Sequence, residues 1–359
     1  MELLSDFSSS YAEADQRFVE HARARGFDVQ SYSPALEGPD GESLHTRVAR
    51  LGRPDARRVA LIQSGTHGIE GYVGSAAQLG WLRAGDHDLP DDLAVVLVHA
   101  INPHGFAWGY RETQERVDLN RNFRDFGSPL PKNPGYAALH DAFCCPAMDG
   151  PIREAADRAI AEFRDMHGER AFLVALASGQ YEREGGLYFG GLGPTWSNQT
   201  FRAILASLGP RLEALTLVDI HSGLGPFGYG MPITLAPARS EQLQRTREAF
   251  GSSVVAPLEE DDSFISEIGG TVMQAASACL PERQVSSIAL EFGTYSTDND
   301  TETYRNILWL RDHGDWDGPE GHRIRAAFRE HFCPAAEDWR EMTWLRSQQV
   351  IRQAINAIA

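Results

Sequence analysis

The sequence predicts an α/β fold in which a mixed, mainly parallel sheet lies between helices. Residues 59–62 and 93–98 are continuous apolar runs, as in strands buried on both faces, and residues 73–81 between them carry apolar side chains at helical spacing. Residues 215–220 and 287–290 have the pattern of two further buried strands. Strands that alternate with helices in this way form parallel sheets covered by helices.

The remaining elements are predicted from shorter signals. An N-terminal helix is predicted after Ser10, which fits a capping box with Glu13, and Gly26 is placed to end it. Residues 44–48 alternate as in a partly exposed strand. Near the C-terminus, residues 304–310 and 344–358 carry apolar side chains at helical spacing and predict two more helices.

One stretch lies outside this pattern of strands and helices. Residues 127–135 have the composition of a loop, and residues 152–177 are helical in pattern. We expect an insertion around residues 124–184, beside the cleft, within a single domain that spans residues 1–359.

Composition excludes several classes of protein. The 359 residues are 42% hydrophobic and 23% charged, as in an ordinary globular chain. No apolar run reaches the ~18 residues of a membrane span, and the N-terminal residues lack the features of a signal peptide, so we expect a cytoplasmic protein without a membrane partner. The four cysteines show no zinc-finger spacing and predict free thiols. The net charge of −17 argues against nucleic acid as a partner.

The loop after the first buried strand carries a possible metal-binding pair. His67 and Glu70 lie three residues apart among glycines, at the carboxyl end of the strand, where open α/β sheets bind their ligands. An imidazole and a carboxylate so spaced can converge on one cation, and zinc accepts both. A polar loop that caps a helix would have the same residues, so the pair alone does not decide.

A second polar block comes after the second buried strand. It contains Arg111 and the run Asp118-Leu-Asn-Arg-Asn-Phe123, which is rich in groups that bind carboxylates, phosphates or histidine N–H. A solvated loop would look similar. Together, however, His67-x-x-Glu70, Arg111 and this run resemble the zinc metallocarboxypeptidase superfamily, which includes the succinylglutamate desuccinylase and aspartoacylase deacylases.

The resemblance predicts a third histidine and a catalytic glutamate at later strand ends. His221 comes directly after the strand at residues 215–220, and Glu291 directly after the strand at residues 287–290. Four motifs therefore occur in the order of the superfamily, although the likeness thins out between residues 126 and 216. The wording of the motifs at residues 64–71 and 185–191 is closest to a bacterial branch of the superfamily.

The resemblance implies a metal site. His67, Glu70 and His221 would bind one zinc ion per chain, with water in the fourth position. Asp118 matches the acid that accepts the other N–H of a ligand histidine. Asp219, two residues before His221 on its strand, points to the same side and is a second candidate for that role.

The resemblance also implies roles in catalysis and substrate binding. Glu291 would be the general base that takes a proton from water and passes it to the leaving amine. Arg111 matches the arginine that stabilises the oxyanion. Asn120 and Arg121 match the pair that binds the terminal carboxylate of the substrate.

The sequence departs from the superfamily pattern at three places, one of which is Thr113, where an asparagine is usual. Carboxypeptidases carry a tyrosine that closes over the substrate, and residues 263–270 contain none. Tyr181, Tyr229 and Tyr295 are the substitutes that we consider. Arg116 stands where a glycine is usual, and it either favours an acidic substrate or lies at the surface.

We therefore expect a zinc hydrolase that cleaves an amide bond next to a free carboxylate. A metallocarboxypeptidase acting on a small peptide is the first interpretation, and a deacylase acting on an N-acyl amino acid is the alternative. The remote alternative is a dinucleotide-binding oxidoreductase, because residues 223–228 fit the Gly-x-Gly-x-x-Gly pattern. Against it, Pro226 stands where a helix should begin. A serine hydrolase is excluded because no Gly-x-Ser-x-Gly occurs.

Overall fold

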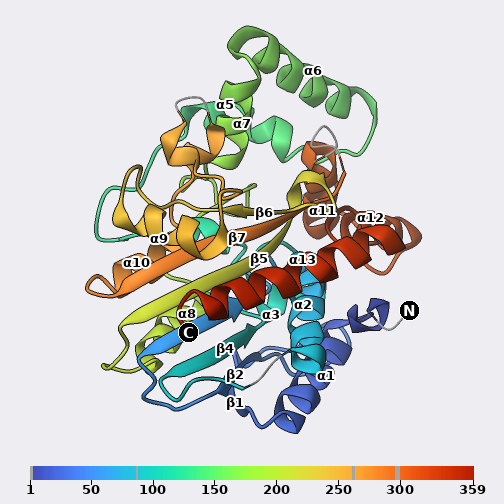
Figure 1. Ribbon diagram of the computed structural model, residues 1–359. Coiled ribbons are helices and arrows are strands. Elements are labelled where there is room, and N and C mark those ends of the chain that lie inside the picture. The colour runs from blue at the N-terminus through green and yellow to red at the C-terminus, as the bar shows by residue number, and fades with distance from the viewer. Residues whose placement is uncertain (1–2, 86–87, 261–262, 296–299) are drawn as a thin grey trace.

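The computed structural model describes residues 3–85, 88–260, 263–295 and 300–359. These residues form a seven-stranded sheet in the order β1-β2-β4-β3-β5-β7-β6 (Figure 1). The strands are β1 (Asp28–Tyr32), β2 (Thr46–Leu51), β3 (Arg58–Gln63), β4 (Leu93–His99), β5 (Ala214–Phe227), β6 (Gly230–Ile233) and β7 (Gln284–Gly293). The four central strands β4, β3, β5 and β7 are parallel, and the outer strands pair antiparallel. The predicted fold class is confirmed.

Helices cover both faces of the sheet. The face of β3 that carries Ala60 and Ile62 packs under α1 (Tyr11–Ala24), α2 (Gly71–Ala84) and α13 (Glu337–Asn356), with α9 (Glu241–Phe250) beside α13 (Figure 1). The opposite face, with Val59 and Leu61, packs against α8 (Trp196–Ser207) and α10 (Val272–Cys279). Because both faces are covered, the central strands are buried along most of their length.

The remaining helices lie mainly beyond the carboxyl ends of the strands or connect elements there. They are α3 (Pro103–Trp108), α4 (Leu119–Asn122), α5 (Pro134–Phe143), α6 (Gly150–His167), α7 (Glu169–Ala177), α11 (Asp300–His313) and α12 (Pro319–Phe332). Two short 3₁₀ turns matter for the site, η2 (Gly68–Glu70) and η4 (Phe264–Glu267). No helix within the described residues is long and apolar enough to cross a membrane.

The N-terminal helix begins at the predicted residue, with a different second cap. The Ser10 side chain accepts from the Glu13 backbone N–H, as expected. The Glu13 carboxylate, however, accepts from the backbone N–H and the hydroxyl of Ser9 rather than from Ser10. Gly26 lies just beyond the helix with a φ of 80°, which glycine adopts without strain.

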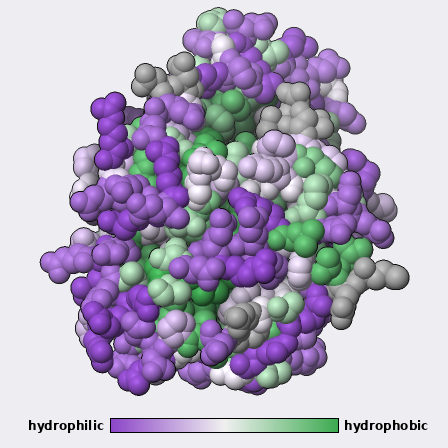
Figure 2. All heavy atoms as spheres, in the orientation of Figure 1, coloured by the Kyte–Doolittle hydropathy of each residue, from purple (hydrophilic) through white to green (hydrophobic). Residues whose placement is uncertain are grey.

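The helices α5, α6 and α7 fall within residues 124–184 and pack on one another (Figure 1). The helical pattern at residues 152–177 is interrupted once, at Gly168, whose φ of 84° turns the chain between α6 and α7. α7 also packs against η4. Figure 2 shows a mainly hydrophilic face, with hydrophobic side chains visible between the uppermost helices and the rest of the molecule.

Candidate active site

The loop after β3 is held in place by close packing on α3. The backbone N–H groups of Gly68 and Ile69 donate to the carbonyls of Arg111 and Tyr110. A Cβ at Gly68 would lie 2.0 Å from the Gly105 backbone, so only glycine fits there. These backbone hydrogen bonds hold the segment that carries Glu70 next to the segment that carries Arg111.

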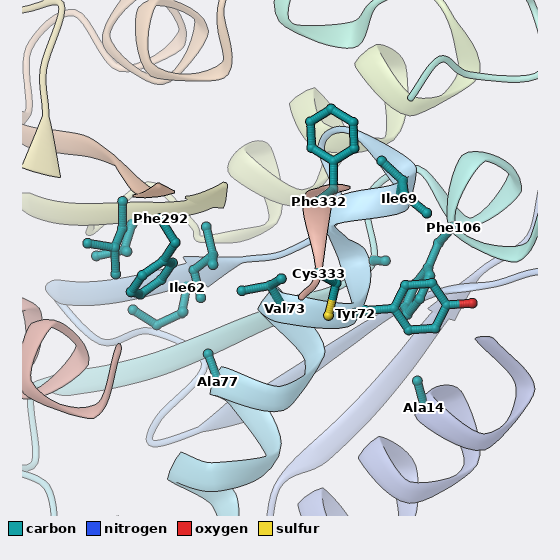
Figure 3. Close-up of a cluster of buried hydrophobic side chains, with 14 of the residues drawn as sticks. Ala14, Ile62, Ile69, Tyr72, Val73, Ala77, Phe106, Phe292, Phe332 and Cys333 are labelled. Carbon is teal, nitrogen blue, oxygen red and sulfur yellow. The ribbon is translucent and has the colours of Figure 1, made fainter. Parts of the chain in front are cut away.

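A hydrophobic cluster packs against this loop. Ile69 and Tyr72 lie on either side of Glu70 and pack in the core near Phe106 (Figure 3). The rings of Tyr72 and Phe106 meet edge to face with centroids 4.7 Å apart. A close-packed base of this kind restricts the positions that the Glu70 side chain can take.

The structure brings His67, Glu70 and His221 together. The Glu70 carboxylate lies between the two rings, with Oε1 2.8 Å from His67 Nδ1 and Oε2 2.8 Å from His221 Nδ1. All three side chains are buried, and one ligand atom from each lies within 4.8 Å of the others. Among the described residues, these three form the one group of His, Cys, Asp or Glu side chains that could hold a metal ion.

The other ring nitrogen of each histidine faces a second carboxylate. His221 Nε2 lies 2.7 Å from Asp219 Oδ2, and His67 Nε2 lies 3.4 Å from Asp118 Oδ1. Burial opposes ionisation of Asp118, but the Arg111 guanidinium outweighs it and holds the pKa of that carboxyl well below its usual value. Both predicted partner acids therefore lie next to the histidines.

This donor set fits a zinc ion. A neutral imidazole has one N–H, and if each histidine directs it at Nε2 toward the neighbouring aspartate, the Nδ1 lone pairs point to the centre. The Glu70 oxygens point to the same centre. Two imidazole nitrogens and a carboxylate, buried and convergent, are the ligands of a catalytic zinc site of the His₂Glu kind.

Glu291 stands beside this cluster and outside it. It lies opposite His221 in the register of β5 and β7, and its Oε1 accepts from the backbone N–H of Leu224. Its side chain borders a cavity that His67, His221, Arg111 and Arg121 also line. Burial raises the pKa of Glu291 to about 7, in the range in which a carboxyl group can both accept and release a proton.

Arg111 is held from three directions. Its Nε donates to Asp118 Oδ2 at 3.0 Å, and its Nη1 lies 3.0 Å from the Tyr304 hydroxyl and 3.3 Å from Glu70 Oε1. Burial disfavours the charge of Arg111, but Asp118 and its other neighbours raise the pKa well above the ordinary value. A charged donor is therefore fixed within the cavity wall.

Asn120 and Arg121 lie on the short helix α4, which Asp118 caps by accepting from the Asn120 N–H. Asn120 Oδ1 accepts from the Val272 N–H at the start of α10. Arg121 donates through Nε and Nη2 to the Ala177 carbonyl and through Nη1 to the Asn120 carbonyl. Both side chains border the cavity.

The side chain of Arg121 is not paired with a carboxylate of the described residues. Among the described residues, Arg121 forms no ion pair with Asp118 or Asp125. Its partners are backbone carbonyls, which carry no net charge. Its own positive charge therefore remains available to a ligand.

None of the three tyrosines considered from sequence borders this cavity. Tyr181 is buried, and Tyr229 and Tyr295 are exposed. Two other tyrosines, Tyr188 and Tyr304, form part of the cavity wall. Sequence reasoning missed both, although Tyr188 lies within the glycine-rich motif at residues 185–191.

The cavity has a volume of about 290 Å³ and a largely apolar wall beside Glu291. The apolar side chains come from β6, β7, α7, α10 and the η4 region, and include Leu176, Leu235, Ile265, Ile268, Met273 and Ala289. Arg116 lies elsewhere, half-exposed, with its Nη1 3.1 Å from Asp312 Oδ1. The surface interpretation of Arg116 is therefore the correct one.

The dinucleotide pattern has no helix to support it. Residues 223–227 belong to the end of β5, which the chain leaves to return antiparallel to β7 as β6. A dinucleotide site needs a helix that begins at the third glycine and directs its N-terminus at the phosphates. Residues 223–228 therefore do not form the dinucleotide-binding turn on which the oxidoreductase alternative depended.

A family model described as "Protein of unknown function (DUF2817)" matches residues 7–346. No curated relative matches the chain. Among solved structures, bovine thrombin-activatable fibrinolysis inhibitor, in complex with tick carboxypeptidase inhibitor, has a TM-score of 0.52 at 12% identity, over 97% of this chain and 96% of that one. Carboxypeptidase A from Helicoverpa armigera has a TM-score of 0.45 at 16% identity, over 92% and 74%. The chain therefore has a fold like that of the bovine protein.

Proposed function

The chain belongs to the family described as "Protein of unknown function (DUF2817)", and we propose that it is a zinc-dependent carboxypeptidase that removes a residue with an apolar side chain from a small peptide. The observation that carries the proposal is the meeting of three features in one cavity. The His67, Glu70 and His221 donors lie beside Glu291, and both adjoin an apolar wall near Arg121.

In this proposal His67, Glu70 and His221 would hold one zinc ion per chain. Zinc bound there supplies a Lewis acid that polarises a carbonyl and lowers the pKa of water. Asp118 and Asp219 hold the histidine rings in the tautomer that leaves Nδ1 free. Each of these four contacts is 2.7 to 3.4 Å long.

Glu291 moves the proton. Its carboxylate takes a proton from the attacking water and later gives it to the amide nitrogen that leaves, so that the reaction ends with a free amine and a new carboxylate. A pKa of about 7 suits both halves of this transfer. Arg111 donates to the oxygen on which negative charge develops, and Asp118 and Tyr304 keep its guanidinium in place.

Arg121 and Asn120 bind the carboxylate next to the scissile bond. A guanidinium meets a carboxylate with two parallel charge-assisted hydrogen bonds, which fixes the orientation of the substrate. Among the described residues, Arg121 donates hydrogen bonds to neutral carbonyls. A substrate carboxylate would therefore give it an anionic partner. Substrates without a free carboxylate should therefore bind poorly.

The apolar wall indicates which side chain the substrate carries beside its carboxylate. Leu235, Met273 and Ala289 pack as one cluster, with Ile265 against it. Ala289 lies two residues before Glu291 and so faces the same side of β7. A side chain that leaves the carbon next to the bound carboxylate would enter this apolar region, where burial of each methylene is worth about 0.8 kcal/mol.

The deacylase alternative uses the same amide chemistry, and one experiment separates the two. We would measure zinc by elemental analysis of the purified protein, then compare hydrolysis of N-blocked dipeptides ending in Leu, Phe, Lys or Glu with hydrolysis of N-acyl leucine. The proposal expects about one zinc per chain and fastest cleavage of the Leu and Phe dipeptides. Faster cleavage of the N-acyl amino acid would favour the deacylase. If neither kind of substrate is hydrolysed, the proposal is refuted.

A further inference from the structure

Tyr188 adopts a backbone conformation that a bulky residue rarely takes. Its φ is 51°, in the left-handed region. Among the described residues, the other non-glycine residues with positive φ are Ala35, Arg116 and Arg239, and all three are exposed, whereas Tyr188 is buried. Strain of this kind persists only where the surroundings impose it, and it is concentrated at functional sites.

Hydrogen bonds on either side of Tyr188 hold it in this conformation. The Gln180 N–H donates to the Tyr188 carbonyl, and the Gly190 N–H donates back to the Gln180 carbonyl. The Phe189 carbonyl accepts from the Asp118 N–H at 2.8 Å. The segment that carries Tyr188 is therefore hydrogen-bonded to Asp118, the residue that caps α4, and α4 carries Arg121.

The ring of Tyr188 lies near both arginines of the cavity. The Arg111 Cζ is 5.0 Å from the ring centroid, and the Arg121 Cζ is 5.4 Å from it. Both distances are within the ~6 Å range of a cation–π contact. Tyr304, whose hydroxyl contacts Arg111, packs against the same ring with centroids 5.6 Å apart.

Two guanidinium groups that share one buried wall repel each other, and both lose hydration there. An aromatic ring attracts a cation through its quadrupole but carries no charge of its own. It therefore stabilises both arginines without neutralising either. A carboxylate in the same place would cancel the positive charge that a substrate anion needs.

We propose that Tyr188 is a substrate-positioning residue that keeps Arg111 and Arg121 in place, and charged, for an anionic ligand with a free carboxylate. This inference rests on the proposed function for its biological meaning, but it can be tested by binding alone. The ring is the essential part, and the hydroxyl is not. The left-handed backbone is what brings the ring to the two guanidinium groups.

The test compares two variants of Tyr188. Tyr188→Asn removes the ring, and asparagine tolerates positive φ, so the backbone strain is relieved rather than increased. Tyr188→Phe keeps the ring and removes only the hydroxyl. The zinc-loaded protein is titrated calorimetrically with N-acetyl-L-leucine, which has a free carboxylate, and with its amide, which does not.

The expected result is a selective loss. Tyr188→Asn should weaken binding of N-acetyl-L-leucine by about tenfold and change binding of the amide by less than about twofold, because a cation–π contact away from water is worth up to about one decade. Tyr188→Phe should bind N-acetyl-L-leucine with an affinity within about threefold of that of the unchanged protein. Tyr136→Leu serves as the control, since Tyr136 is a buried tyrosine that does not border the cavity.

Two outcomes would overturn the proposal. If Tyr188→Asn melts like the unchanged protein and binds the acid equally well, the ring does not position the arginines. If it loses the acid and the amide alike, the ring is only apolar wall. A protein that hydrolyses none of the substrates above but shows the selective loss would refute the proposed function and leave this inference standing.

Discussion

Glu291 and His221 lie opposite each other on the neighbouring parallel strands β7 and β5. Side chains at paired positions of a sheet point to the same face, so both reach the cavity at the carboxyl edge. His221 contacts the Glu70 carboxylate, whereas Glu291 stays outside the cluster of metal-type donors. The register of β5 and β7 thus places a residue that can bind a metal, His221, next to one that can move a proton, Glu291.

Removing a ligand should remove the metal. We expect His67→Ala to reduce bound zinc from about one per chain to less than about a tenth, because only two protein donors would remain. Elemental analysis after gel filtration measures this. His140→Ala is the matched control, since His140 lies on α5 outside the cluster. Undiminished zinc in a folded His67→Ala protein would rule out the site.

Glu291→Gln should separate chemistry from metal binding. The amide keeps the shape of the side chain but cannot accept the proton from water, so kcat should fall by roughly 10²–10⁴ while the zinc content stays the same. Steady-state kinetics and elemental analysis of one preparation give both values. Near-normal turnover would remove Glu291 from the mechanism, and loss of zinc would make it a ligand.

Arg121 should matter only for substrates with a free carboxylate. A charge-assisted contact in a cleft is worth roughly 1.5–3 kcal/mol, so capping the carboxylate as an amide should lower kcat/KM by about tenfold to a hundredfold or more. Arg121→Ala should narrow the gap between the free and capped substrates. Equal harm to both would mean that Arg121 serves only to connect α4 to the Ala177 carbonyl.

Filling the apolar wall should change the preference for side chains. Ala289→Leu adds three carbon atoms beside Leu235 and Met273, and it should lower kcat/KM for a C-terminal Phe by about tenfold while changing that for a C-terminal Ala by less than about threefold. Overpacking costs about 1–3 kcal/mol of stability, so a thermal melt accompanies the kinetics. A uniform loss for both substrates would show that this wall does not contact the side chain.

His99 should make the fold sensitive to mild acid. Burial lowers the pKa of His99 to about 4, whereas the unfolded value is near 6.5. The unfolded chain then binds one more proton between these values, so stability is fully present above about pH 6.5 and is lost as pH falls toward 4. From pH 7.5 to 5 the loss is about 2 kcal/mol.

Urea unfolding at the two pH values measures this loss, and His99→Leu should reduce it. Leucine cannot be protonated, and it can still pack against Phe18, on which the His99 ring is stacked. An unchanged pH dependence in that variant would assign the acid sensitivity to other groups.

Local signals in the sequence were sufficient for the main elements and for the site residues near strand ends. Buried apolar runs predicted β3, β4, β5 and β7, because a strand covered on both faces needs apolar side chains throughout. In a parallel sheet the carboxyl ends of the strands meet at one edge. Motifs at strand ends could therefore be expected to converge even though they are far apart in the chain, as His67 and His221 do.

Other features depended on distant contacts that no local pattern encodes. The roles of Asp118 and Asp219 depend on which nitrogen of each histidine they reach. One of the two carbonyls that Arg121 contacts, that of Ala177, belongs to α7, far along the chain. The extent of the insertion as a structural unit stays a prediction. Gly168, which divides α6 from α7, lies in a stretch whose apolar spacing is continuous.

The sequence by itself determined the buried central strands, the order of the motifs and the residue types that can bind zinc, because a strand covered on both faces must be apolar along its length. Only the tertiary structure decided which tyrosines border the cavity. Tyr188 is brought there by a left-handed backbone and by hydrogen bonds to a loop much earlier in the chain, as the bond between Asp118 and Phe189 shows. Contacts between segments so far apart depend on how the whole chain packs, and periodicity within one segment carries no record of them.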